Sequence, residues 1–139
     1  MSTRGRKADL KVIEGGLEDA PDVPTHIPED MRQQWLDVVE DLRGRKMLTE
    51  AMIGSVDAYV MAMWNARKAQ AALDLYGVLI DGGKGVMKQN PAVSLLGKAT
   101  STIQRLAAEL GLTPASRSRP KMRGDDRGDE GQQNDLFNF

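Results

Sequence analysis

The fold of this chain is decided by the stretch that ends its helical part, Ala107-Ala108-Glu109-Leu110-Gly111-Leu112-Thr113-Pro114-Ala115-Ser116-Arg117-Ser118-Arg119. Gly111 can adopt the left-handed conformation that closes a helix, and Leu112 can then fold back onto the last turn. Pro114 is expected to prevent the helix from resuming, and basic residues follow it. The stretch therefore predicts a junction between a helical body and a basic tail.

The helix that ends at Gly111 is predicted to begin with Asn90 as its N-cap and Pro91 at its first position, a common arrangement at helix N-termini. Apolar residues recur along it at the spacing of one helical face. That face comprises Ala92, Leu95, Leu96, Ala99, Ile103, Leu106, Ala107 and Leu110.

Two further helices are predicted upstream. The first runs from Pro28 to about Arg43, and Gly44 ends it. The second has Thr49 as its N-cap and runs to about Tyr76, before Gly77. Its broad surface of alanine and methionine favours packing against other subunits, although a long core helix fits the pattern equally well. The residues assigned to oligomerisation are Met52, Val56, Tyr59, Val60, Met63, Leu96, Ile103 and Leu106.

The segment between Gly77 and Asn90 predicts a small β-hairpin. Val78-Leu79-Ile80 is prone to strand formation, Asp81-Gly82-Gly83-Lys84-Gly85 has the composition of a turn, and Val86-Met87 is again apolar. A lone hairpin is marginal in water, so it must lean on the helices or on a neighbouring subunit. The expected fold is mostly α, a three-helix core with this hairpin between the second and third helices.

Length and charge divide the chain of 139 residues into three parts. We expect a flexible N-terminal arm, basic and then acidic, over residues 1–27, a helical oligomerisation core over 28–116, and a flexible C-terminal tail over 117–139. The absence of cysteine excludes disulfides, thiolate metal sites and cysteine nucleophiles. No segment has the character of a secretory signal or a membrane span, so the cytoplasm is the expected location.

Two basic clusters are the candidate DNA-binding residues, because lysine and arginine neutralise phosphates without reading sequence. The first comprises Arg4, Arg6, Lys7 and Lys11, and the second Arg117, Arg119, Lys121 and Arg123. In a monomer such clusters are more often solvated tails. Repeated around a symmetric oligomer, they would form a basic ring that holds a duplex.

Other motifs give no support to an enzyme. Gly82-Gly83-Lys84-Gly85 lacks the spacing of a nucleotide-binding phosphate loop, and His26 has no nearby ligand partners, which predicts a linker histidine. The paired acids near residues 125–130 have no scaffold, so neither a metal nor another cofactor is expected. The terminal residues Leu136, Phe137 and Phe139 are interpreted as a docking peptide for a partner, with a chance apolar end as the alternative.

The order of these features resembles the phage terminase small subunit. The matching motifs are Gly5-Arg6-Lys7, Trp35, Met47-Leu48-Thr49, Tyr59, Asn90-Pro91-Ala92 and Leu110 to Arg117. The resemblance implies a non-enzymatic ring that binds double-stranded viral DNA and recruits and regulates a large subunit holding the ATPase and nuclease. A DNA-reading helix-turn-helix is not evident. The alternatives are a ring-forming structural or adaptor protein of the phage particle without DNA binding, and a small DNA-binding regulator.

Overall fold

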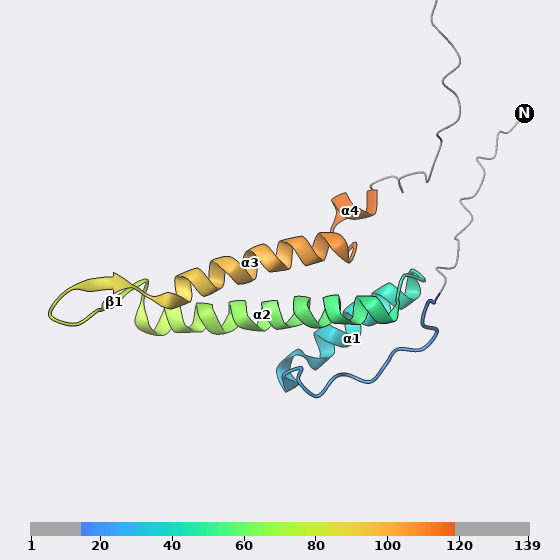
Figure 1. Cartoon of the computed structure of the whole chain (residues 1–139), viewed down its shortest axis with the longest axis horizontal. Coiled ribbons are helices and arrows are strands. Elements are labelled where there is room, and N and C mark those ends of the chain that lie inside the picture. The colour runs from blue at the N-terminus through green and yellow to red at the C-terminus, as the bar shows by residue number, and fades with distance from the viewer. Residues whose placement is uncertain (1–14, 119–139) are drawn as a thin grey trace, which may run out of the picture.

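The computed structural model describes residues 15–118, and its elements are mostly helical. In chain order they are η1 (Glu29–Met31), α1 (Arg32–Gly44), α2 (Glu50–Tyr76), β1 (Leu79–Asp81), β2 (Met87–Gln89), α3 (Pro91–Glu109) and α4 (Pro114–Ser118). α2 and α3 lie side by side as an antiparallel pair, with the hairpin at one end and α1 against α2 toward the other (Figure 1). The predicted mostly helical fold, with a hairpin between the second and third helices, is confirmed.

The helix predicted from Pro28 begins with a single 3-10 turn, η1, and continues as α1 from Arg32. A 3-10 turn is frequent where a helix begins. The turn starts directly after Pro28, whose carbonyl accepts a hydrogen bond from the Met31 amide at 2.9 Å. The Met31 side chain is fully buried and belongs to the hydrophobic core.

The predicted bounds of α2 are confirmed at both ends. Thr49 occupies the N-cap position in an extended conformation, and Gly77 follows the last residue with a φ of 84°. The Gly77 amide donates to the Leu73 carbonyl at 2.8 Å, which completes the last turn. Glycine suits this position because a positive φ is costly for residues with a Cβ atom.

Asn90 joins the β-hairpin and the start of α3 to the end of α2 through hydrogen bonds. Its side-chain oxygen accepts from the Ala92 amide at 3.0 Å, which is the predicted N-cap. Its side-chain amide donates to the Gly77 carbonyl at 2.9 Å, and its backbone amide donates to the Val78 carbonyl at 2.7 Å. The strands pair antiparallel, with Ile80 opposite Lys88.

The end of α3 forms the closure that its sequence predicts. Gly111 has a φ of 67°, and its amide donates to the Ala108 carbonyl at 3.2 Å. The Leu112 amide donates back to the Ala107 carbonyl at 2.8 Å, and the Leu112 side chain packs against the core. This pair of bonds is the Schellman motif, which satisfies the last free carbonyls of a helix.

The prediction that no helix resumes at Pro114 is wrong, because α4 begins at this residue. Thr113 and Ser116 cap each other: the Ser116 amide donates to Thr113 Oγ1 at 3.2 Å, and the Thr113 amide donates to Ser116 Oγ at 3.3 Å. Proline is favoured at the first position of a helix, since the amide proton that it lacks has no partner there. Thr113 to Ser116 is therefore a helix start.

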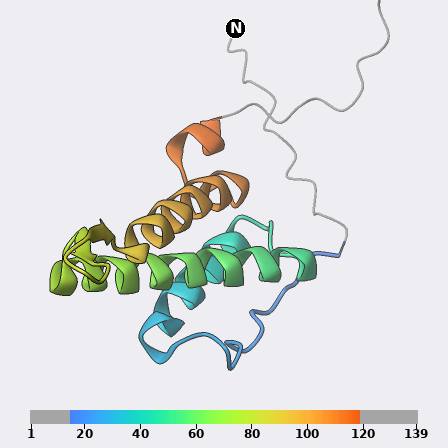
Figure 2. The ribbon, with the colours of Figure 1, turned by 60° about the vertical axis from the view of Figure 1, so that its left-hand side comes forward.

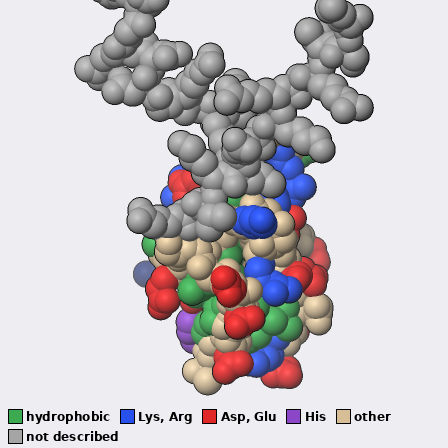
Figure 3. All heavy atoms as spheres, turned by 90° about the vertical axis from the view of Figure 1, so that its right-hand side faces the viewer, with side chains coloured by type: hydrophobic (Ala, Val, Ile, Leu, Met, Phe, Trp, Pro, Cys, Tyr) green, Lys and Arg blue, Asp and Glu red, His purple; other side chains and the backbone are tan. Residues whose placement is uncertain are grey.

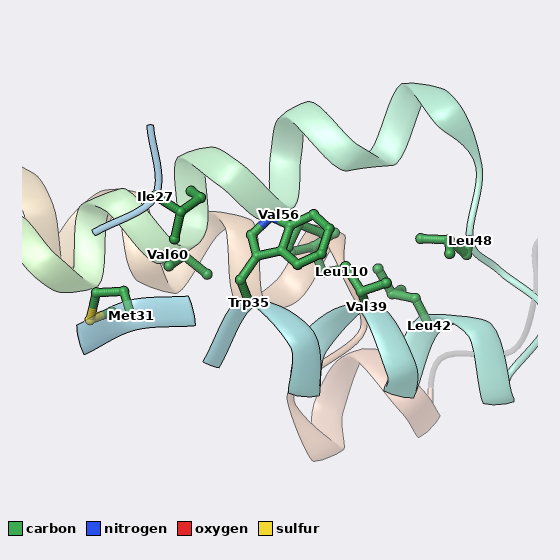
Figure 4. Packing of buried hydrophobic residues seen from close by; sticks show 9 residues of the cluster. All are labelled: Ile27, Met31, Trp35, Val39, Leu42, Leu48, Val56, Val60 and Leu110. Carbon is green, nitrogen blue, oxygen red and sulfur yellow. The ribbon is translucent and has the colours of Figure 1, made fainter. Parts of the chain in front are cut away.

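The hydrophobic core lies where α1, the first half of α2 and the C-terminal end of α3 meet (Figure 4). Trp35 is at its centre, and the indole Nε1 donates to Asp57 Oδ1 at 2.6 Å. The buried residues of the cluster are Ile27, Met31, Trp35, Val39, Leu42, Leu48, Val56, Val60 and Leu110. Toward the hairpin, by contrast, the buried apolar side chains of the α2–α3 pair are Ala62, Ala69, Ala92 and Ala99.

The segment before η1 is extended, as its prolines predict, and it also packs on the helices. The Leu17 amide donates to the Leu48 carbonyl at 2.9 Å, and Gly16 pairs with Thr49 in an antiparallel bridge. Ile27 is buried in the core. The expected boundary between arm and core at residue 27 thus falls inside the packed part of the protein. Within residues 15–118, no helix has the length and apolar character that a membrane crossing requires.

Candidate nucleic-acid interface

One end of the α2–α3 pair, opposite the hairpin, gathers basic side chains from three parts of the chain. They are Arg43, Arg45, Lys46 and Arg117, and we call this set the basic end. The C-terminus of α1 and the turn before α2 supply the first three, and α4 supplies the fourth. Seen from this end, blue side chains lie among red ones (Figure 3). The charges are therefore mixed.

Arg45 ties the basic end to the core. Its Nε and Nη2 donate to Asp41 Oδ2 at 3.0 and 2.6 Å, and Nη2 also donates to the Leu110 carbonyl at 2.9 Å. Its side chain is 24% exposed. Because the Leu110 carbonyl belongs to the end of α3, this guanidinium joins α1 to α3. Arg45 is therefore mainly a structural residue.

Arg117 is placed differently from its prediction. It was expected to begin the flexible tail, whereas it lies in α4 and contacts the end of α3 and α1. Its Nε donates to the Gly111 carbonyl at 2.9 Å, and its Nη2 lies 3.3 Å from Asp41 Oδ1. The side chain is half exposed. Asp41 is thus shared by two guanidinium groups, and Arg117 still faces solvent.

Arg43 forms an ion pair on the surface of α1. Its Nε and Nη2 donate to the two carboxylate oxygens of Glu40 at 2.9 and 2.6 Å. These hydrogen bonds lower the pKa of the Glu40 carboxyl, and they raise the pKa of the Arg43 guanidinium. Both side chains are solvent-exposed, so the pair contributes little to stability.

Lys46 is the least neutralised cation of the basic end. It is exposed, and within residues 15–118 it takes part in no ion pair. Its φ of 57° is a left-handed conformation that turns the chain from α1 into α2. The following first turn of α2 contains Glu50, Ala51 and Met52, none of which is a typical reader of base edges. The turn therefore suits phosphate contact better than sequence readout.

A surface pocket of about 480 Å³ lies beside Lys46. The extended segment before α1 forms one wall, and the turn between α1 and α2 forms the other. The lining residues are Gly16, Leu17, Glu18, Glu40, Arg43, Gly44, Lys46 and Leu48. Two carboxylates face two cations here, so the pocket has no net preference for an anion. Among the described residues, no group of histidine and carboxylate side chains has the arrangement of a metal site.

Most of the predicted DNA- and partner-binding residues lie outside the described residues. These are Arg4, Arg6, Lys7, Lys11, Arg119, Lys121, Arg123, Leu136, Phe137 and Phe139. Their assignment stays a prediction.

The residues predicted to form subunit contacts are mostly used within the chain itself. Val56, Val60 and Leu106 are buried. Met52, Tyr59 and Met63 are half-buried and pack against the core cluster. Leu96 and Ile103 on α3 are half-buried as well. Their role in oligomerisation stays a prediction, but the three buried side chains have almost no surface to offer a neighbouring subunit.

Sequence reasoning overlooked two features of this region. Arg43, Arg45 and Lys46 form a short basic run around Gly44, and that run was a usable signal. His26 lies in a turn of the segment before η1, and its Nε2 is 3.1 Å from Asp57 Oδ2, so Asp57 contacts both His26 and Trp35. No local sequence pattern predicts the contact between His26 and Asp57, since the two residues are far apart in the sequence.

Comparison with curated proteins and with solved structures gives no significant match. A protein-family model does match the chain over residues 32–127, and the family is described as phage terminase, small subunit. The matched region is well over half of the chain. It includes α1 to α4, and hence all four residues of the basic end.

Proposed function

The chain belongs to the phage terminase small-subunit family, and from that premise we propose that it is a non-enzymatic DNA-packaging component that binds double-stranded viral DNA. It acts in the host cytoplasm as a homo-oligomeric ring. Its partner is the large terminase subunit, which carries the ATPase and nuclease.

The observation that carries the DNA-binding part is the convergence at the basic end. Arg45 and Arg117, which are 72 positions apart, meet at the Asp41 carboxylate, and the Gly111 carbonyl also holds Arg117 there. In the sequence, Arg119, Lys121 and Arg123 follow directly after α4. The rest of the second basic cluster therefore begins directly after the helix that carries Arg117.

The chemistry of this surface favours binding to the DNA backbone. Guanidinium and ammonium groups displace counterions from phosphates, which gives affinity that falls steeply with salt. Arg117 is able to exchange Asp41 for a phosphate because it is half exposed. Lys46 can bind a phosphate without leaving a carboxylate, since it takes part in no ion pair within residues 15–118.

Oligomerisation is what makes this weak surface effective. Glu40 and Asp41 offset part of the positive charge in each chain, so a single copy binds DNA weakly. In a closed symmetric assembly every chain presents the same basic end, and the contacts to one duplex add.

The DNA-binding proposal is tested by the affinity of the full-length chain for duplex DNA across a salt series. We expect log K to fall linearly with log salt concentration. The slope should become shallower when Arg117, Arg119, Lys121 and Arg123 are replaced by alanine. Absence of binding at low salt would overturn the proposal and favour a ring-forming adaptor of the phage particle.

The partner contact is tested separately. Deletion of residues 134–139 removes Leu136, Phe137 and Phe139. We expect the deletion to leave the native mass of the assembly, corrected for the missing residues, and DNA affinity unchanged, and to reduce stimulation of the large subunit's ATPase. Unchanged stimulation would reject the docking role of these residues.

A further inference from the structure

The hairpin end of the molecule exposes an unusual concentration of large apolar side chains. Of the eight large hydrophobic residues that are exposed within residues 15–118, seven lie between positions 75 and 95, and the other is Leu36 on α1. Their exposed fractions range from 44% to 72%. We call them the apolar tip: Leu75, Tyr76, Val78, Leu79, Val86, Met87 and Leu95.

Both faces of the hairpin contribute to the apolar tip. Asp81 pairs with Met87 and Leu79 pairs with Gln89, so Leu79 and Met87 share one face. The Gly82 amide donates to the Val86 carbonyl and the Asn90 amide to the Val78 carbonyl, which places Val78 and Val86 on the other face. Strands of three residues make a hairpin that is marginal in water by itself. Cover on either face would stabilise it.

The chain's own core does not reach this region. The buried members of the core cluster end on α2 at Val60, half-buried side chains packed against it reach Trp64, and α1 packs at that end (Figure 2). Beyond it, α2 and α3 contact each other through small side chains such as Ala69 and Ala92. The hairpin is therefore carried at the end of a two-helix arm, with no third element of residues 15–118 over it (Figure 1).

We propose that the apolar tip is the surface on which a second copy of this chain docks. This inference deepens the proposed function, since it rests on the homo-oligomer and names one surface through which its chains meet. The predicted stripe along α2 and α3 is a poor alternative, because Val56, Val60 and Leu106 are already buried.

The area of the apolar tip fits such a contact. Burying a whole valine or leucine side chain removes roughly 60–120 Å² from water, as its transfer free energy implies. Seven side chains at these exposures therefore present roughly 250–500 Å² of apolar surface per chain. At the upper end, two copies together reach about 1,000 Å², the lower bound for a specific protein interface.

The charges around the apolar tip favour a copy of the same chain as the partner. Asp74, Asp81, Lys84 and Lys88 surround it, and they sum to no net charge. None of the four forms an ion pair within the described part of the chain. A duplex or a strongly charged protein meets no complementary field here. Where the tips of two copies meet, by contrast, the lysines of one copy can face the aspartates of the other.

A contact at the apolar tip also leaves the basic end open. The two regions lie at opposite ends of the α2–α3 pair (Figure 1). Chains joined through the tip therefore keep their basic ends available for DNA.

The test is the native mass of the full-length protein across micromolar concentrations. The variant Leu79→Thr with Met87→Thr removes apolar surface and keeps strand-forming residues, since threonine is β-branched. We expect this variant to need at least tenfold more protein to assemble than the wild type. The matched control is Leu36→Thr, which changes the one exposed large hydrophobic outside the tip and should leave assembly unchanged.

Assembly of the double variant at the wild-type concentration would overturn the proposal, and so would a wild-type chain that is a monomer throughout. If the double variant loses helical circular dichroism, the variant Leu75→Ser is used in its place, because Leu75 is 72% exposed on α2 outside the hairpin. Assembly of Leu75→Ser at the wild-type concentration would also overturn the proposal. Binding to a short duplex separates the two proposals. A monomeric tip variant that still binds DNA with salt-dependent affinity supports both, whereas loss of assembly in a protein that never binds DNA rejects only the DNA-binding role.

Discussion

Gly111→Ala is the substitution that tests most sharply how the basic end is built. The glycine has a φ of 67°, which closes α3. A Cβ atom added there would lie 2.8 Å from Nη1 of Arg45. The substitution therefore strains the backbone and displaces the guanidinium that bonds Asp41 and the Leu110 carbonyl.

The expected loss of unfolding free energy is about 1–3 kcal/mol. The left-handed conformation costs an alanine about 1–2 kcal/mol, and a hydrogen bond to a charged group contributes about 1.5–3 kcal/mol when it is lost entirely. Arg45 can shift and keep part of that bond. The reduced entropy of the unfolded chain returns about 0.4–1 kcal/mol.

The assay is urea unfolding at a fixed protein concentration, because assembly would make stability depend on concentration. The control is Gly97→Ala, a glycine inside α3 where an added Cβ meets nothing within 4 Å. We expect this control to stabilise the protein by about 0.5–1 kcal/mol. The reasoning is refuted if Gly111→Ala is no less stable than the wild type while Gly97→Ala behaves as expected.

Three further predictions concern the carboxylates. Asp57→Ala leaves the buried indole of Trp35 without its acceptor and should cost about 1–3 kcal/mol in urea unfolding; Asp57→Asn, which keeps an acceptor, should cost less, and equal losses would contradict this role. Asp41→Asn should raise duplex affinity a few-fold, because Arg117 would leave a neutral amide for a DNA phosphate more easily than it leaves the Asp41 carboxylate. Lower affinity with unchanged circular dichroism would count against this prediction. The lowered pKa of Glu40 stabilises the fold above the carboxyl's unfolded pKa, and this contribution is lost as pH falls through the folded pKa. Glu40→Gln should therefore show a flatter loss of stability in acid, and an identical profile would show that the ion pair has no effect.

The sequence predicts the local elements of this fold well. The ends of α2 and the start of α3 are set by short-range signals, namely Thr49, Gly77 and the Asn90-Pro91 pair. The closure at Gly111 is likewise local, since all its hydrogen bonds span five residues or fewer. Thr113 to Ser116 is an equally local signal for a helix start, and it is overlooked when Pro114 is taken only as a helix breaker.

The candidate site could not be predicted in the same way. Arg45 meets Leu110 across 65 positions, and Arg117 meets Asp41 across 76. Such contacts depend on how α1 and α3 pack on α2, which periodicity does not reveal. The sequence predicts the apolar tip only in part: it indicates that a hairpin that is marginal in water must pack against the helices or a neighbouring subunit. Its extent depends on the core ending near Trp64 on α2, which only the structure shows.

The central claim, that DNA meets the basic end, is tested most directly by a matched pair of substitutions. Lys46 and Lys84 are the two non-glycine residues with positive φ in residues 15–118, at 57° and 53°, and they lie at opposite ends of the molecule. Replacing either by glycine removes one charge and suits the backbone. The measurement is duplex affinity of the full-length chain across a salt series. Lys46→Gly is predicted to weaken binding and reduce the salt slope by about one per bound chain, whereas Lys84→Gly leaves both unchanged; equal effects of the two substitutions would contradict the claim.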